Sequence, residues 1–571
     1  MSTDSLHYPE TLVFVGAGAT ASLGMPQSDL QSIFFRALAG RKNEASLENI
    51  LSDSGSKKIF GNVPPFKGRD LEFMAAFIRF LGDDISKDWY SVDEEDLSNG
   101  RIVFGYSTDE SLLCSRILEL RREYDWNGLK QVIGICPNDG EGDNLVRDIY
   151  TLLDLKIQNK QGIKVQVDEG RPVVIEQGRL PKVRNCAILF TNILFANAWY
   201  ELSRGGKNDE FQKYVNFMET LSKMMQREGA LFANRGYRLE SPLFYCMSCA
   251  MISLNFETVF LWLRFNANRN ANTNGFFLSG QKLETWFDFG LISKRREISS
   301  DSEKRKDGVF KFSQIETSIY RLNGLKTSGT PVGRIGSFFF AHGSCNWREC
   351  PSCGRMMYYL GDKWDYKPAH LNPPFPIPLF ENTDFNRTAM EKEWKSKLRY
   401  DSLECISCGA ETIASNAPMI MQTMIKGIPT SFLDEVQRES RVLLGKARHI
   451  VLLGYQLPPD DILWQEAFAE AVRSRKDSEN GAYCSVVVGN LGRKCWIYDD
   501  EMMQYANAHR YEKNASGYGA NAIVNAVSIF GKAHVRAYCG GIPDVFGDGF
   551  EADVKAILYP EWVNWKGTRL N

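Results

Sequence analysis

The sequence predicts an α/β protein built on a parallel β-sheet, and three observations support this prediction. Apolar runs of strand length end in glycine or a polar residue and alternate with amphipathic segments. A long stretch with helical periodicity separates the first run from the next, and two Cys-x-x-Cys pairs occur late in the chain. At 571 residues the chain exceeds what one hydrophobic core usually supports. We therefore expect a Rossmann-like sheet with helices on both faces, a four-cysteine zinc module and a large helical insertion.

The first predicted element is a buried strand followed by a glycine turn and a helix that starts near Ser28, in "TLVFVGAGATASLGMP". The small residues Gly16, Ala17, Gly18 and Ala19 follow the strand directly. Small residues at such a turn allow backbone N–H groups to approach a phosphate. The segment is not the dinucleotide fingerprint G-x-G-x-x-G, because position 21 is alanine. A plain strand-to-helix turn is the alternative interpretation.

The next region, from 68 to 227, shows mostly helical periodicity. In "RDLEFMAAFIRFLGDD", "ESLLCSRILELRREYDW" and "EFQKYVNFMETLSKMMQ", apolar residues recur at i, i+3 and i+4. Several amphipathic helices must bury their apolar faces against something. We therefore expect an inserted helical unit that provides a surface for self-assembly, and a homo-oligomer.

The sheet is expected to resume after this region. "SPLFYCMSCAMISLNFET" has strand character and precedes a helix at "VFLWLRF", whereas "NANRNANTNG" at 266–275 predicts a polar turn. The charged segment 293–308 predicts a solvated loop, and its basic residues leave nucleic-acid binding open. Later, "RHIVLLGYQLPPDD", "ILWQEAFAEAVRS" and "YCSVVVGN" predict strand, helix and strand. Ligands of such a sheet gather at the carboxyl ends of its strands.

Four of the thirteen cysteines predict a metal site. Cys350 and Cys353 form one Cys-x-x-Cys-Gly knuckle, and Cys405 and Cys408 form a second about fifty residues later. Four thiolates complete the tetrahedral ligand set of a structural zinc ion. Two pairs of buried free thiols are the alternative, but they leave the repeated pattern unexplained. A third pair, Cys246 and Cys249, lies in an apolar segment and predicts core packing.

Charge and hydropathy exclude some classes of protein. The 68 basic and 70 acidic residues give a net charge of −2, so nothing global attracts the chain to nucleic acid or to a membrane surface. The longest apolar runs are too short to span a bilayer, and "MSTDSLHYPE" does not resemble a secretory signal. We expect a cytoplasmic protein without membrane association.

Taken together, the motifs resemble the sirtuin-like family. "GAGATASLGMP" looks like the sirtuin GAG-x-S-x-x-x-G-I-P loop, "SLNFET" like its Gln-Asn-x-Asp segment and "AHGS" like its Leu-His-Gly segment. The paired cysteines follow, and then "VLLGYQLPPDD" and "VVVGN" occupy the places of the later nucleotide-binding strands. The resemblance covers about residues 10–35 and 240–540. Its motif forms are most similar to the sirtuin-like domains of bacterial anti-phage defence proteins.

The resemblance implies an NAD hydrolase that depletes NAD⁺ during phage defence, because those domains cleave NAD⁺ rather than deacylate proteins. Two departures from the deacylase pattern agree with this expectation. The family's arginine is missing after Pro26, where the chain reads "PQSD", and Glu257 replaces the family's aspartate. An NAD or ADP-ribose sensor or scaffold without turnover, and an NAD-dependent deacylase, remain the alternatives.

The resemblance also implies roles for individual residues. Asn255 and His342 take the catalytic positions, with His342 as a base whose ordinary pKa is near ~6.5. The alternatives are a strand-end cap for Asn255 and a hydrogen-bonded core histidine for His342. The implied NAD⁺-binding residues are Gly16, Ala17, Gly18, Ala19, Glu257, Gly454, Tyr455 and Asn490. Aromatic packing is the simpler interpretation of Tyr455 and of Trp347.

The predicted organisation interleaves these units. The sirtuin-like domain is expected over 1–60, 236–345 and 416–545, the helical insertion over 61–235, the zinc module over 346–415 and a C-terminal tail over 546–571. Uncontrolled NAD⁺ loss would kill the host. The resemblance therefore implies activation through oligomerisation or through a partner, such as a HerA-type ATPase or a phage-derived trigger.

Overall fold

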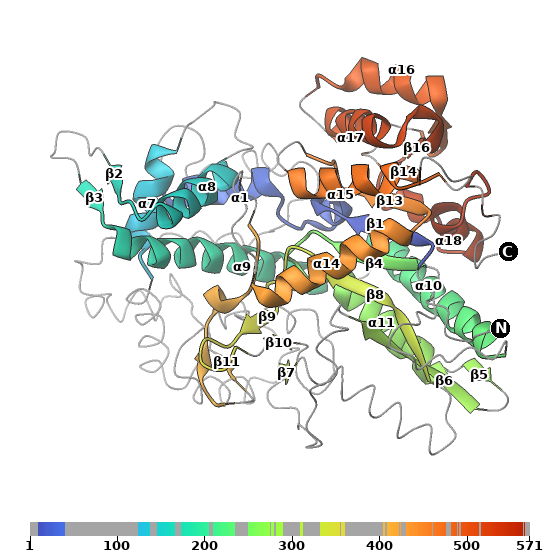
Figure 1. Cartoon of the computed structure of the whole chain (residues 1–571), viewed down its shortest axis with the longest axis horizontal. Helices are drawn as coiled ribbons and strands as arrows, with labels where there is room; N and C mark the ends of the chain where they lie inside the picture. The colour runs from blue at the N-terminus through green and yellow to red at the C-terminus, as the bar shows by residue number, and fades with distance from the viewer. Residues whose placement is uncertain are drawn as a thin grey trace.

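The computed structural model describes most of the predicted sheet and part of the predicted insertion (Figure 1). One of the three helices predicted in the insertion, most of a second, the charged segment 293–308, Cys246 and Asn490 lie outside the described residues. The described residues are 9–39, 124–136, 145–165, 173–204, 209–234, 249–274, 276–278, 281–288, 309–311, 332–354, 356–359, 403–405, 408–421, 423, 430–458, 461–475, 481–487, 489, 493–512, 515–563 and 565.

The largest sheet confirms the α/β prediction. Its strand order is β15-β16-β14-β13-β1-β4-β8-β6-β5, and the seven strands from β16 to β6 are mutually parallel. Only the two edge strands are antiparallel to their neighbours. The strands are β1 (Thr11–Val15), β4 (Cys249–Ser253), β5 (Phe276–Leu278), β6 (Gln281–Asp288), β8 (Val332–Phe340), β13 (His449–Leu453), β14 (Tyr483–Val487), β15 (Trp496–Tyr498) and β16 (Val535–Tyr538).

Helices cover both faces of this sheet, as predicted. On β1, Phe14 packs edge-on against Phe468 of α15 (Ile462–Arg473), with ring centroids 4.7 Å apart. Thr11 on the same strand donates a hydrogen bond to the carbonyl of Leu558 in α18 (Glu551–Leu558). Because side chains alternate along a strand, residues three apart point to opposite faces. The helices α15 and α18 therefore lie on opposite sides of the sheet.

The described part of the predicted insertion is mainly helical and shares the core of the sheet domain. Phe190 of α9 packs edge-on against Phe35 of α1, with ring centroids 4.9 Å apart. The region also contains a small hairpin, β2 (Ile163–Val165) with β3 (Val173–Ile175), which the periodicity does not indicate. The helices concerned are α1 (Ser28–Leu38), α7 (Trp126–Ile135), α8 (Leu145–Gln158), α9 (Leu180–Arg204) and α10 (Asp209–Asn234).

The predicted polar turn at 266–275 is wrong, because the helix α11 extends over Val259–Asn274. Ala267 and Ala271 lie one turn apart and are both buried, and the side chain of Asn270 donates to Glu219 of α10 at 3.3 Å. Small side chains allow α11 to lie close against α10, so tertiary packing outweighs the weak helix propensity of the asparagines.

The C-terminal third also belongs to this core. The helix α14 (Ser431–Lys446) begins after Thr430, whose hydroxyl caps the N–H of Leu433. The helices α16 (Asp499–His509) and α17 (Ala515–Phe530) pack against each other beside β14 and β16. The predicted tail includes α18, which is tied to α10 through a hydrogen bond from Thr220 to the carbonyl of Gly549 at 2.6 Å. Among the described helices, none has the length and apolar character needed to cross a bilayer.

Candidate functional site

Four neighbouring parallel strands bring the predicted motifs to one edge of the sheet. Val15 of β1 is in register with Leu453 of β13 and with Ser253 of β4, and Ser253 is in register with Phe340 of β8. The glycine turn, "SLNFET", "AHGS" and "GYQLPPDD" each follow one of these strands. The predicted residues from four distant segments are therefore assembled at the carboxyl edge of the sheet, where ligands of such sheets bind.

The two glycine turns pack directly against each other. The N–H of Gly16 donates to Leu453 at 2.9 Å, and that of Gly18 donates to Gly454 at 3.0 Å. A Cβ atom on Gly16 would lie 2.5 Å from the carbonyl oxygen of Gly454, and one on Gly454 would lie 2.1 Å from the nitrogen of Ala19. Gly454 also has a φ of +62°, which strongly favours glycine. Both glycines are therefore required for this backbone contact.

The glycine turn is also held from the region predicted as an insertion. The hydroxyl of Tyr214 in α10 donates to the carbonyl of Ala19 at 2.7 Å and lies 2.8 Å from the hydroxyl of Ser22. The N–H groups of Gly16, Gly18 and Ala19 all take part in backbone hydrogen bonds. Ala17, by contrast, lines a cavity beside the turn. In this conformation, three of the four predicted phosphate-binding N–H groups already have protein partners.

Asn255 and Glu257 form a hydrogen-bonded unit under the glycine turn. The amide nitrogen of Asn255 lies 3.0 Å from both the carbonyl oxygen of Gly16 and Oε1 of Glu257. The same carboxylate accepts from the hydroxyl of Thr20 at 3.0 Å and from the N–H of Val259 at 2.6 Å. Burial raises the pKa of Glu257 above its ordinary value, although these three donors favour its ionised form.

A cavity of about 500 Å³ opens beside this unit. Its polar lining comes from Asn255, Glu257 and Thr20 and from glutamines that follow the glycine turn, and its apolar lining includes Phe195 of α9. The missing arginine after Pro26 is relevant here, because Gln27 and Gln31 line the cavity instead. This mixture of apolar and hydrogen-bonding groups is typical of ligand pockets.

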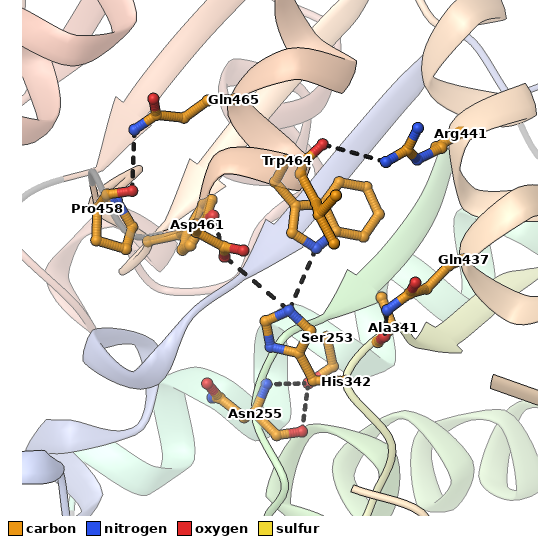
Figure 2. Close-up of polar contacts among 12 residues, drawn as sticks. Ser253, Asn255, Ala341, His342, Gln437, Arg441, Pro458, Asp461, Trp464 and Gln465 are labelled. Carbon is orange, nitrogen blue, oxygen red and sulfur yellow. Dashed lines mark hydrogen bonds and ion pairs between the residues drawn. The ribbon is translucent and has the colours of Figure 1, made fainter. Parts of the chain in front are cut away.

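His342 follows β8 at the same carboxyl edge of the sheet and contacts Trp464 of α15 (Figure 2). The indole Nε1 of Trp464 donates to Nε2 of His342 at 3.3 Å, and Oδ2 of Asp461 lies 4.0 Å from the same nitrogen. Gly343 has a φ of +83°, and a Cβ atom there would lie 1.7 Å from the carbonyl oxygen of Pro418. The next residue after the histidine must therefore be glycine for this turn to form.

Asp461 and Trp464 are the residues that sequence reasoning missed. With His342, Gln437 and Arg441 they line a second cavity of about 270 Å³. Asp461 is buried, and its Oδ2 accepts a 2.7 Å hydrogen bond from the hydroxyl of Tyr455. Its other oxygen, Oδ1, is buried without a hydrogen-bond partner among the described residues. The only signal in the sequence is the position of "PPDD" after a strand and before a helix.

The structure thus places the two predicted catalytic residues on neighbouring strand ends, where they line two different cavities. Asn255 lines the cavity under the glycine turn, and His342 lines the one beside α15. Tyr455 is buried and contacts Asp461. Trp347 packs between Phe340 and Phe432, with ring centroids 5.5 and 5.1 Å away, so the packing interpretation of this tryptophan is confirmed.

The four predicted cysteines lie together and could hold a metal ion such as zinc. Their Sγ atoms all lie within 4.8 Å of one another, with Cys350 3.6 Å from Cys408 and Cys353 3.7 Å from Cys405. Tetrahedral zinc with Zn–S bonds of about 2.3 Å requires sulfur separations of about 3.8 Å. Although burial opposes ionisation, the N–H groups of Cys353 and Ser352 lower the pKa of Cys350 to about 7.

Short antiparallel strands carry the two knuckles. The first knuckle follows β9 (Trp347–Glu349), which pairs with β10 (Met356–Tyr359), and β10 pairs with β7 (Val309–Lys311). The second lies between β11 (Leu403–Glu404) and β12 (Glu411–Thr412). The glycines that end the knuckles, Gly354 and Gly409, have φ values of +64° and +74°. This left-handed conformation explains why glycine follows each pair.

The third cysteine pair is described only in part. Cys249 is buried at the start of β4, and burial raises its pKa to about 12. This thiol is therefore a core residue, as predicted.

Comparisons with known proteins were made with the whole chain. No protein-family model matches it, and no curated protein matches it either.

Proposed function

We propose that this protein is an NAD⁺ hydrolase that cleaves NAD⁺ to nicotinamide and ADP-ribose, and that it depletes NAD⁺ in anti-phage defence. The observation that carries the proposal is the assembly of the glycine turns, Asn255 and His342 at the ends of four adjacent parallel strands. The motif resemblance supplies the substrate, and the polar cavity beside Asn255 supports binding of an amide-bearing group.

The proposed reaction needs little acid catalysis, because nicotinamide leaves a cationic ring as a neutral molecule. The bond between C1′ of the ribose and the nicotinamide nitrogen breaks, and its electron pair leaves with nicotinamide. The oxygen of a water molecule forms the new bond to C1′, and His342 accepts the proton that this water loses. Asn255 orients the water or a ribose hydroxyl through its amide, and positioning of this kind contributes much of the rate.

The four-cysteine module supports the site without taking part in the chemistry. The N–H of Ile420 donates to the carbonyl of His342 at 2.9 Å, and Gly343 pairs with Met419 in a β-bridge. These residues follow the second knuckle at Cys405 and Cys408. We infer that a bound zinc ion stabilises the segment that holds the backbone of His342.

The test is an incubation of purified protein with NAD⁺, in which nicotinamide and ADP-ribose are quantified by chromatography. Wild type is expected to release both, and Asn255→Ala is expected to lose this activity per folded molecule, with a lower melting temperature because two buried hydrogen bonds are lost. Saturable binding without release would contradict the proposal and identify a sensor. A parallel incubation with an acetyl-lysine peptide tests deacylation, and NAD⁺ consumption that depends on the peptide would also contradict hydrolysis.

A further inference from the structure

We propose that Asp461 and Trp464 are positioning residues that select which nitrogen of His342 carries the proton. This inference rests on the proposed function, because it assigns a controlling device to the proposed base. Both side chains face the same ring atom. Nε2 of His342 lies 3.3 Å from Nε1 of Trp464 and 4.0 Å from Oδ2 of Asp461 (Figure 2).

The two partners require opposite states of that nitrogen. An indole N–H can only donate, so Trp464 requires a lone pair on Nε2, and a neutral ring then carries its proton on Nδ1. An ionised carboxylate can only accept, so a hydrogen bond to Asp461, for which the 4.0 Å separation must shorten, requires a proton on Nε2, and a neutral ring then has its lone pair on Nδ1. One nitrogen cannot satisfy both partners in the neutral ring. His342 therefore has two tautomers, each matched to one neighbour.

The geometry indicates which tautomer can act as a base toward the site of Asn255. In Figure 2 the Nε2 atom points toward Asp461 and Trp464, whereas Asn255 lies beyond the opposite side of the ring. A water molecule on the Asn255 side must give its proton to Nδ1. Only the tautomer that donates from Nε2 to Asp461 has a lone pair there. The tautomer held by Trp464 is the resting form.

The surroundings of Asp461 fit this role. Its Oδ2 already accepts from Tyr455, which fixes the carboxylate, and its Oδ1 has no hydrogen-bond partner in the described part of the chain. A buried carboxylate that is incompletely paired is costly. Donation from Nε2 of His342 to Oδ2, the oxygen that faces it, would give this carboxylate a second donor and would stabilise the charge that forms when the ring accepts a proton.

The remaining polar groups that line the cavity belong to α14. Gln437 donates to the carbonyl of Ala341 at 2.9 Å, and a guanidinium nitrogen of Arg441 lies 3.4 Å from the carbonyl oxygen of Leu463. Among the described residues that line this cavity, Arg441 is the basic one and Asp461 the acidic one.

The test compares Asp461→Ala with Trp464→Phe, because the two changes should act in opposite directions. Asp461→Ala leaves only Trp464 at Nε2, and nicotinamide release should fall about 10- to 1,000-fold through kcat, with little change in KM. Trp464→Phe removes the competing donor but keeps an aromatic ring, and its kcat should rise above that of wild type. Asp461→Glu should partly restore the activity lost in Asp461→Ala.

A second readout does not depend on activity. The chain has six histidines, so NMR spectra of protein labelled at the imidazole nitrogens are simple. The signals of His342 are identified because they are missing from the spectrum of His342→Ala. Without NAD⁺, the proton of His342 should move toward Nδ1 in Asp461→Ala and toward Nε2 in Trp464→Phe. Glu466→Ala, an exposed change in the same helix, is the matched control and should leave the tautomer unchanged.

The outcomes separate the two proposals. If wild type releases no nicotinamide, the proposed function fails, yet the tautomer measurement still tests the inference. If His342 has the same tautomer in wild type, Asp461→Ala and Trp464→Phe, the inference is overturned even where hydrolysis is observed. Parallel losses of activity in both variants with unchanged tautomers would assign both residues a purely structural role.

Discussion

Two buried histidines lie at opposite ends of the same sheet and have different partners. His449 begins β13 and is fully buried, and His342 follows the end of β8 and is 7% exposed. Nδ1 of His449 lies 3.2 Å from the carbonyl oxygen of Leu558, and its Nε2 lies 2.7 Å from the hydroxyl of Ser485. His342 faces a carboxylate and an indole that compete for one nitrogen.

The difference shows that burial alone does not identify a functional histidine. Burial and the nearby guanidinium of Arg536 lower the pKa of His449 to about 3, so this ring stays neutral and joins β13 to α18 and β14. His342 lines a cavity and has a carboxylate whose second oxygen lacks a partner among the described residues. His449 therefore has the properties of a structural residue, whereas His342 has the surroundings that its proposed role as a base requires.

The largest expected effect separates the two histidines by activity. His342→Ala should lower nicotinamide release per folded molecule about 100- to 10,000-fold, because it removes the proposed base. It also leaves the buried indole N–H of Trp464 unpaired, so the free energy of unfolding should fall by about 1–3 kcal/mol. His449→Ala should lower the free energy of unfolding by about 1–3 kcal/mol, because it leaves buried polar partners unpaired. Its activity per folded molecule should be unchanged. Equal losses of activity in both variants would break the comparison.

Metal removal should affect the end of the sheet that holds His342 and spare the end that holds His449. Cys405→Ser removes one of four thiolates, and the bound zinc should fall from about one ion per chain to nearly none, as measured by atomic emission. Amide hydrogen exchange should rise around 342–345 and stay unchanged around 449–453. Cys495→Ser, at an exposed thiol outside the cluster, is the control. Faster exchange at both ends would indicate global unfolding instead.

A change at the glycine contact should also act on the carboxyl edge. Gly454→Ala forces a Cβ atom against the backbone of Ala19 at a positive φ, and the free energy of unfolding should fall by about 2–4 kcal/mol in urea titrations. Gly445→Ala is the matched control, because nothing lies near its Cβ position and it lies in a helix. Gly445→Ala should raise the free energy of unfolding by about 0.5–1 kcal/mol. Equal stabilities of the two variants would contradict the close contact.

The pH dependence of stability also distinguishes His449. The folded-state pKa of His449, about 3, lies below its ordinary value of 6.5, so the unfolded chain binds the proton more tightly. The contribution of His449 to the free energy of unfolding is complete above pH 6.5 and is lost as the pH falls toward 3. The free energy changes by up to about 1.4 kcal/mol per pH unit in this range. The difference in urea midpoint between wild type and His449→Gln should shrink as the pH falls from 7 to 4. A constant difference would show that His449 does not titrate in this way.

Much of the framework could be predicted from local patterns. The strands that contain Phe14, Leu453 and Val487 are apolar runs followed by turns, and the helix starts at Ser28 and after Thr430 carry their own signals. The knuckles at Cys350 and Cys405 were predicted because metal ligation imposes a short spacing that is visible in the chain. The α11 helix could not be predicted from its asparagines, because its close contact with α10 joins residues distant in sequence.

The sequence by itself determined that Gly16, Asn255, His342 and Gly454 follow apolar strands, and that four cysteines form two Cys-x-x-Cys pairs. Strand and knuckle patterns are local, so they can be read without knowing what lies nearby in space. Only the tertiary structure decided that Asn255 and His342 line different cavities, and that Asp461 and Trp464 share one nitrogen of His342. The contacts of Asp461 and Trp464 with His342 depend on the packing of α15 against Phe14 of β1 and against the turn that follows β8. That packing joins segments more than one hundred residues apart, such as Trp464 and His342.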